Sequence, residues 1–250
     1  MAEAKAQSEA GPAPRRREVP QPATIFDPVA RALEVIGDRW TLVLVRQLLL
    51  APRGFQDLRM RTGIAPRVLS SRLRQLTSDG FVEQVQSGSR SIYAVTERGR
   101  SLEPIIASIA QWWVHQGMRD LAVDPGRFNE TSPQSIIESL PFLLREEKAR
   151  DANVTFEIRL TGTGGGVWTV AIRDGHCEVQ PDFADRADVR YTADAKVWCA
   201  VALGLADARD MHKRGLLTKD GGQAAMNEYF HQIARDGTGF ALDDEGATAG

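Results

Sequence analysis

One predicted helix, residues 66–80, has two sharply different faces and constrains the fold of this chain most. Pro66 suits the first turn of a helix, where its missing N–H leaves no hydrogen bond unmade, and Gly80 suits a helix end. Three leucines recur at helical spacing and form one apolar stripe: Leu69, Leu73 and Leu76. The pattern therefore predicts an amphipathic helix that packs through its leucines.

The opposite face of this helix carries long cations and small hydroxyls and no bulky hydrophobic side chain. Its members are Arg67, Ser70, Ser71, Arg74 and Ser78. An arginine can donate to guanine O6 and N7 together, and a serine can donate to a phosphate or a base edge. For an isolated helix, an ordinary solvated face is the better interpretation of the same pattern.

The flanking residues favour nucleic-acid recognition instead. Upstream, Phe55, Leu58 and Met60 indicate a short amphipathic helix, and residues 62–64 form a glycine-containing turn, as in a helix-turn-helix. Downstream, residues 81–85 and 92–95 are β-prone, and residues 86–91 between them suit a hairpin loop.

Arg90 would lie near the tip of this hairpin, or wing. There it could reach a minor groove or a phosphate, and a surface salt bridge is an equally good interpretation.

The charge of this region agrees with a polyanionic partner. Residues 46–100 contain ten arginines, no lysine and four acidic residues, a formal charge of +6. The whole chain has a formal charge of −2, so the remainder carries −8. A basic module within an acidic chain predicts a polyanion for that module alone.

Seven short motifs follow one another in this part of the chain: Asp27-Pro28-Val29, Ile36-Gly37-Asp38-Arg39-Trp40, Gly54-Phe55-Gln56-Asp57-Leu58, Gly63-Ile64, Leu69-Ser70-Ser71-Arg72-Leu73, Asp79-Gly80-Phe81-Val82 and Tyr93-Ala94-Val95-Thr96-Glu97-Arg98-Gly99. Together they resemble the HxlR family, small winged-helix bacterial transcription regulators related to MarR proteins. The resemblance implies a homodimer that binds double-stranded DNA at a pseudo-palindromic operator. Many members carry a cysteine where this chain has Asp27, so cysteine-based sensing of oxidants is not expected.

Helices are also predicted on both sides of the basic stretch. Residues 1–24 look like a disordered arm, and Asp27 and Pro28 predict the start of a helix over residues 28–36, followed by a helix over residues 39–50. Thr96 can cap a long helix over residues 97–118. Its candidate dimer-interface residues are Ile109, Trp112 and Trp113, with an intrachain core as the alternative. Residues 25–120 are thus the expected DNA-binding and dimerisation domain.

The second half predicts an α+β arrangement, an antiparallel sheet covered by helices. Residues 121–134 have the composition of a linker, and Ser135 and Glu138 resemble a capping box that opens a helix to residue 148. Alternating or β-prone runs predict strands over residues 154–160, 168–172, 177–179 and 187–192. Helices are expected over residues 195–205, 208–215 and 222–234, within a domain of residues 135–236, followed by a flexible tail at 237–250.

Several pieces of this half resemble the sterol-carrier-protein fold: the Trp168 strand, the Asp174-Gly175 turn, Asp188-Val189-Arg190-Tyr191, the helix after Asp194, and residues 214–221. The resemblance implies a pocket for a hydrophobic small molecule. Its candidate lining residues are Phe156, Ile158, Trp168, Val170, Trp198, Leu203, Met211, Met226 and Phe230. Residues of these types more often belong to an ordinary core than to a pocket wall, so ordinary core is the favoured alternative for each of them.

Catalytic and metal-binding patterns do not stand out. The four histidines, His115, His176, His212 and His231, lack ligand spacing, and Cys177 and Cys199 are too few for a disulfide framework or a metal site. We therefore expect no enzyme activity, no metal and no cofactor. The longest apolar run, residues 42–51, is interrupted by Arg46 and Gln47, and the N-terminus has no signal-like apolar segment, so a cytoplasmic protein without membrane contact is expected.

These patterns predict a DNA-binding protein, and the two resemblances together imply a dimeric transcription regulator controlled by a hydrophobic small molecule in its C-terminal domain. One alternative is a DNA-binding protein whose C-terminal domain serves only dimerisation. A lipid-binding carrier is a further, less favoured alternative, because the basic face is intact.

Overall fold

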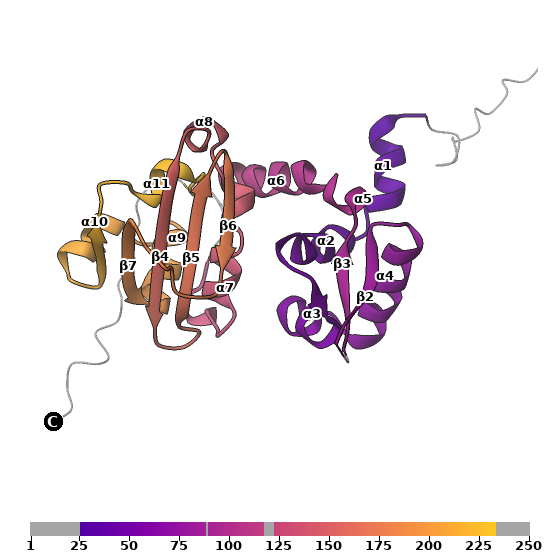
Figure 1. The fold of residues 1–250 in the computed structure, drawn as a ribbon, viewed down its shortest axis with the longest axis horizontal. Helices are drawn as coiled ribbons and strands as arrows, with labels where there is room; N and C mark the ends of the chain where they lie inside the picture. Colours follow the sequence, from indigo (N-terminus) through magenta and orange to yellow (C-terminus); the bar gives the residue numbers. More distant parts are fainter. Residues whose placement is uncertain (1–25, 89, 118–122, 234–250) are drawn as a thin grey trace, which may run out of the picture. The chain divides into compact units, whose positions relative to one another are not determined.

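The computed structural model describes residues 26–88, 90–117 and 123–233 (Figure 1). The described residues divide after Arg39 into two units, and the second begins at Trp40. The predicted arm, the tail and the domain boundary at residue 120 lie outside the described residues. Within the described ranges, no helix has the length and apolar character needed to cross a membrane.

The helix of the first unit, α1 (Pro28–Ile36), begins where the sequence predicts. The Asp27 carboxylate accepts a hydrogen bond from the backbone N–H of Ala30 at 2.8 Å, as an N-cap does. Val29 and Leu33 are 65% and 57% exposed, so α1 presents apolar side chains to solvent.

The second unit begins with the predicted helix-turn-helix and wing, here called the winged-helix module. Its elements are α2 (Thr41–Leu50), β1 (Arg53–Gly54), α3 (Phe55–Thr62), α4 (Pro66–Ser78), β2 (Val82–Ser87) and β3 (Arg90–Val95). The three strands form an antiparallel sheet in the order β1-β3-β2. Gly63 joins α3 to α4 with a left-handed φ of 66°, a conformation that suits glycine.

The wing differs from its prediction in two respects. The expected loop over residues 86–91 is mostly strand, since Gln86 pairs with Ser91 and Ser87 pairs with Arg90. The short strand β1 was not predicted, because two residues carry no periodic signal.

The single helix expected over residues 97–118 is wrong as a continuous element. The chain instead forms α5 (Glu97–Arg100), α6 (Glu103–Trp112) and a π-helical turn, η2 (Trp113–Gly117). Thr96 caps α5 as predicted, accepting from the N–H of Gly99 at 3.1 Å. The break has a local cause, because Pro104 has no N–H to continue the ladder and suits the first turn of a new helix.

The C-terminal α+β region contains a five-stranded sheet in the order β6-β5-β4-β7-β8. Its strands are β4 (Asn153–Thr161), β5 (Gly166–Arg173), β6 (His176–Gln180), β7 (Val189–Asp194) and β8 (Leu217–Gly221). The prediction of an antiparallel sheet is wrong for one pair, since β4 and β7 are parallel. After two hairpins the chain crosses to the far side of β4, and this return cannot be read from the strand patterns. β8 was not predicted.

The helices of this region are shorter than predicted. They are η3 (Pro125–Arg127), α7 (Ser132–Ile137), η4 (Leu140–Leu143), α8 (Glu146–Ala149), α9 (Ala195–Ala202), α10 (Ala208–Lys213) and α11 (Met226–Tyr229). The one helix expected over residues 135–148 is therefore wrong: α7 starts three residues earlier, and Pro141 falls in η4. The helix expected over residues 222–234 is reduced to α11.

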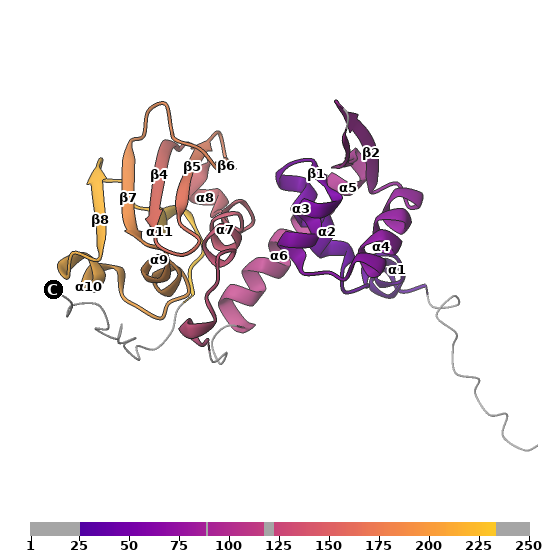
Figure 2. The ribbon, with the colours of Figure 1, turned by 90° about the horizontal axis from the view of Figure 1, so that it is seen from below.

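Helix α9 begins after Asp194, whose carboxylate accepts from the N–H of Lys196 at 2.8 Å, as predicted. It lies against one face of the sheet in both ribbon views (Figures 1 and 2). The core between them includes the buried face of the central strands, with Phe156, Ile158, Val170 and Ile172 at 0% exposure.

Candidate nucleic-acid interface

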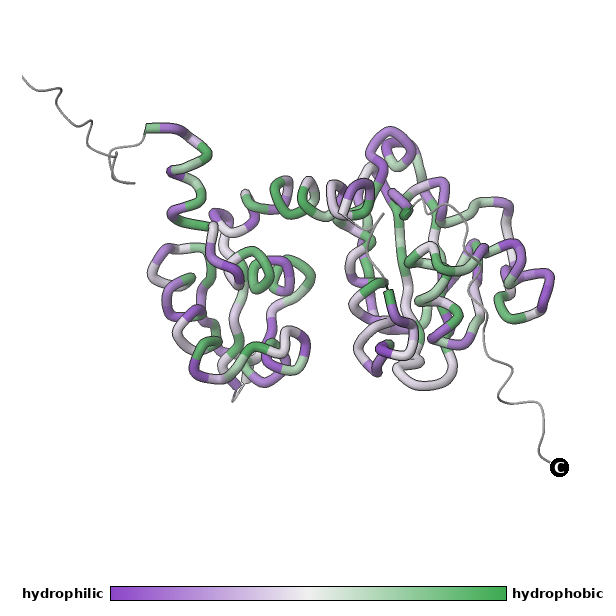
Figure 3. Tube along the Cα trace, turned by 180° about the vertical axis from the view of Figure 1, so that it is seen from behind, coloured by the Kyte–Doolittle hydropathy of each residue, from purple (hydrophilic) through white to green (hydrophobic). Residues whose placement is uncertain are grey.

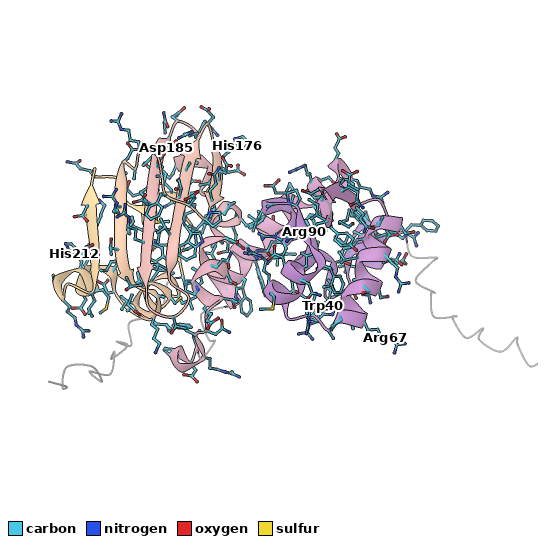
Figure 4. All side chains as sticks on the ribbon, turned by 60° about the horizontal axis from the view of Figure 1, so that its bottom comes forward. Trp40, Arg67, Arg90, His176, Asp185 and His212 are labelled. Atoms are coloured by element: carbon cyan, nitrogen blue, oxygen red, sulfur yellow. The ribbon has the colours of Figure 1, made fainter. Side chains whose placement is uncertain are left out.

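The face of α4 predicted to contact nucleic acid is exposed along its whole length. Arg67, Ser70, Ser71, Arg74 and Ser78, here called the recognition face, are all exposed. The three leucines on the other side of α4 are 0–2% exposed and pack into the module. Arg67 projects outward from α4 in Figure 4. The core thus turns the polar side of α4 to solvent, as the leucine spacing predicts.

The side chains of α4 are held mainly by their own helix. Arg74 Nε donates to the backbone carbonyl of Ser70 at 3.3 Å, a weak contact that an incoming acceptor can replace. Gln75 Nε2 donates to both carboxylate oxygens of Asp79 at 3.0 Å. This bond holds the one acid near the C-terminal end of α4 beside a neutral amide.

Arg90 stands at the tip of the wing, as predicted. It is the first residue of β3, pairs with Ser87 and is exposed (Figure 4 labels it). Gly88, two residues before Arg90, has a positive φ of 59°, which a tight hairpin requires. The ion pairs found among the described residues do not include Arg90.

Three arginines counted in the basic stretch do not contribute to this surface. Arg53 is 7% exposed and donates to the carbonyl of Gln47 at 2.9 Å and to Asp57 at 3.1 Å. Arg61 donates to Asp57 at 2.7 Å and also to Glu138, and the Arg46 guanidinium lies 5.6 Å from the Phe142 ring centre. The formal charge of +6 therefore overstates what the module presents to a polyanion.

These arginines also set the charge state of Asp57. Partial burial alone would raise its pKa, but hydrogen bonds from Arg61 and Arg53 outweigh burial and hold the pKa below its ordinary value. The carboxylate stays ionised and keeps both guanidinium groups in place.

A second surface feature is an apolar face on α6, a helix that follows the winged-helix module in the chain. Its members Ile105, Ile109, Trp112 and the adjacent Trp113 are 40%, 49%, 60% and 42% exposed. They include all three candidate dimer-interface residues. A groove of about 380 Å³ is lined by Pro104, Ile105, Ser108, Ile109 and Trp112, and hydrophobic residues recur along α6 in Figure 3. Ile106 and Val114 face inward and are buried.

Eight of the nine candidate ligand-lining residues belong to the core of the C-terminal α+β region or pack against it, and Leu203 does not. Seven are buried, and Leu203 and Met226 are half-buried. The Nε1 atoms of Trp168 and Trp198 are buried without a hydrogen-bond partner among the described residues. An unpaired buried donor costs roughly 1–3 kcal/mol, so two in one core are unusual. The ligand role of these residues stays a prediction.

The cysteines are poor candidates for reactive thiols. Burial raises the pKa of both Cys177 and Cys199 to about 12, so almost no thiolate forms near neutral pH.

Two side-chain groups escaped sequence reasoning. The Nε2 atom of His115 lies 3.1 Å from Nδ1 of His231, although 116 positions separate them. Glu138 bonds Arg61 across 77 positions instead of capping a helix. In both cases the partners are too far apart in sequence for any local pattern to signal the contact. No cluster of three or more metal-ligating side chains occurs in the part of the chain that the structure describes.

The module and its exposed basic helix define a winged helix-turn-helix protein, and comparisons with known proteins agree. The model of HxlR-like helix-turn-helix proteins matches residues 35–121. The uncharacterised HTH-type transcriptional regulator YybR of Bacillus subtilis is 34% identical over 89 residues, which are 34% of this chain and 71% of that protein. The chain belongs to the HxlR-like helix-turn-helix family.

Two further relatives extend this comparison. An uncharacterised HTH-type transcriptional regulator of Mycobacterium tuberculosis is 41% identical over 87 residues, 34% of this chain and 55% of that protein. The chain thus spans about half the length of this relative. The solved structure of the redox regulator HypR in its reduced form is 32% identical, with a TM-score of 0.34, over 38% of this chain and 95% of that one.

Proposed function

We propose that this protein is a DNA-binding transcription regulator. Helix α4 enters the major groove with its recognition face, and Arg90 at the wing tip contacts the adjacent minor groove or backbone. The observation that carries the proposal is the exposed face of arginines and serines on α4, opposite a buried leucine stripe. Membership of a family whose named relatives are transcriptional regulators supports it.

We further propose that two copies bind a pseudo-palindromic site as a homodimer. The apolar face of α6, described above, leaves two tryptophans and two isoleucines exposed, more than a lone helix usually shows to solvent. A second copy would cover this face and set the spacing of two recognition helices.

Alanine substitution tests the recognition face. Arg67→Ala and Arg74→Ala should each weaken specific binding by about 1–3 kcal/mol, roughly 5- to 150-fold, if these side chains contact bases. Fluorescence anisotropy on labelled DNA from the flank of the protein's own gene measures the change. Arg209→Ala, an equal charge change on exposed α10, is the matched control. Unchanged affinity in both α4 variants would exclude α4 as the recognition helix.

We also propose that the C-terminal α+β region binds a hydrophobic small molecule with a hydrogen-bond acceptor. The unpaired indole N–H groups of Trp168 and Trp198 favour this over a role in dimerisation alone, because an acceptor on a ligand would satisfy them. The molecule acts as an effector if it favours one DNA-binding state over another.

Oleate is a suitable first probe for this site. Binding should raise the melting temperature of the wild type, and Trp168→Phe, which keeps an aromatic ring but removes the N–H, should reduce that rise. In the absence of probe the same variant should be neutral or stabilising. No rise with oleate, or with a panel of similar amphiphiles, would remove the ligand proposal.

A further inference from the structure

Glu138 is a buried carboxylate that joins the C-terminal α+β region to the winged-helix module within one compact unit. It directly follows α7 and is 8% exposed. Arg61 Nη1 donates to its two oxygens at 2.7 and 2.8 Å, and Arg53 Nη2 lies 3.5 Å from Oε1. Gln134 Nε2 donates to Oε1 at 3.0 Å. The carboxylate is therefore held from both sides.

Both arginines lie in elements that set the position of the candidate DNA contacts. Arg61 is in the last turn of α3, two residues before Gly63, where the chain turns into α4. Arg53 is in β1 and pairs with Tyr93 of β3, the strand that begins at Arg90. A group that fixes Arg53 and Arg61 therefore fixes α3 and β1, which adjoin the recognition helix and the wing.

The site depends on Glu138 for its charge balance. Among the described residues, the carboxylates beside Arg46, Arg53 and Arg61 are those of Asp57 and Glu138. Burial lowers the pKa of Arg46, the Arg53 and Arg61 charges lower it further, and Glu138 opposes them. Without Glu138, three guanidinium groups would share one carboxylate in a partly buried place, and their mutual repulsion would loosen the contact.

The same segment is anchored in the C-terminal core. Ile137, next to Glu138, is 0% exposed and belongs to the core that contains Trp198. Helix α7 packs against α9, which carries Trp198. On the module side, Arg46 Nη2 donates to the carbonyl of Ser135 at 3.3 Å. One short helix, α7, thus connects the packing around α9 to Glu138.

We propose that Glu138 is a positioning residue for DNA recognition, and that residues 132–143 carry changes in the C-terminal core to α3 and β1. With the ion pairs formed, α3 and the wing are held in the arrangement seen here. With the pairs broken, the two DNA-contacting elements lose their common anchor. The inference rests on the proposed DNA binding and names the contact through which the C-terminal region would act on it.

Glu138→Gln in the full chain tests the inference, since glutamine keeps an acceptor but cannot form the ion pairs. Affinity for DNA from the gene's own flank should fall at least about fivefold, the low end of typical coupling between sites, while affinity for random DNA stays within twofold. Hydrogen exchange of the α3 amides should become faster. Glu130→Gln, which removes the same charge from an exposed side chain, should change neither reading.

A double-mutant cycle distinguishes an effect of the Glu138–Arg61 ion pair from independent structural roles of the two residues. If Glu138 acts through Arg61, the Arg61→Gln and Glu138→Gln effects on specific affinity should not multiply in the double variant. Multiplicative effects, or a Glu138→Gln variant that behaves like Glu130→Gln in both readings, would overturn the inference. Should Glu138→Gln fail to fold, Arg61→Gln breaks the same pair from the module's side and gives the same comparison. If the wild type binds no DNA, the proposed function fails, while the exchange rates of α3 still decide whether Glu138 holds it.

Discussion

Trp112→Ala should separate the proposed dimer into monomers. Trp112 is 60% exposed in the single chain. A tryptophan side chain buries up to about 250 Å², so roughly 150 Å² remains to be covered in each copy. A twofold-symmetric contact counts this area twice, so at about 25 cal/mol per Å² the two tryptophans contribute at most roughly 7.5 kcal/mol to dimer stability.

The measured loss of dimerisation free energy will be smaller than this upper bound, because association orders side chains and a groove is never filled completely. Interface hot-spot residues typically cost at least about 2 kcal/mol on truncation, and two copies change at once. A loss of at least about 4 kcal/mol, or roughly a 700-fold rise in the dimer dissociation constant, is therefore expected. Sedimentation equilibrium of the full chain measures it. Phe183→Ala is the matched control, because Phe183 is 61% exposed on a loop of the C-terminal α+β region. A Trp112→Ala dimer within threefold of the wild type, or equal dissociation of Phe183→Ala, would refute the reasoning.

Two pH-linked predictions follow from side chains whose pKa is lowered in the folded state, His231 and Glu157. Burial, then the charges of His115 and Arg145, lower the pKa of His231, so the folded state favours its neutral form. The stability it contributes is present above the unfolded pKa of about 6.5 and is lost as pH falls through the folded pKa. His231→Asn should reduce the change in the free energy of unfolding between about pH 7.5 and 5. An unaltered slope of this free energy against pH would contradict the argument.

Glu157 is 1% exposed and bonds two arginines and a backbone N–H. Burial would raise its pKa, but those hydrogen bonds lower it, so its stabilising effect is present above the unfolded pKa of about 4.3 and is lost as pH falls below it. Because both arginines are partly exposed, Glu157→Gln should cost about 2 kcal/mol in urea denaturation at pH 7. The same change at exposed Glu146 should cost almost nothing, and equal costs would refute the burial argument.

The parts of the structure that were predictable from sequence rest on local signals. Asp27 before Pro28 starts α1, Thr96 caps α5, and the leucine spacing orients α4, because caps and periodicity act within one or two turns. The exposed position of Arg67 follows from the orientation of α4. The wing-tip position of Arg90 follows from the predicted hairpin.

The parts that escaped prediction depend on contacts between distant residues. The parallel pairing of β4 with β7 is set by where the chain returns, not by the alternation within either strand. Ser135 and Glu138 have the spacing of a capping box, yet the carboxylate is drawn instead to Arg61. The contact between His115 and His231 is likewise fixed by tertiary packing. So is the full or partial burial of Arg46, Arg53 and Arg61, and counting these arginines from the sequence therefore overstated the positive charge of the surface.

The most direct test of the central claim is binding of the full chain to DNA from the flank of its own gene and to random DNA at two salt concentrations. A regulator that reads sequence should prefer the flank, and the preference should persist when salt weakens the phosphate contacts common to both. Weak binding that declines equally on both DNAs would show only the attraction of a basic patch for phosphate. That result would contradict the account of α4 and Arg90 as sequence-reading elements.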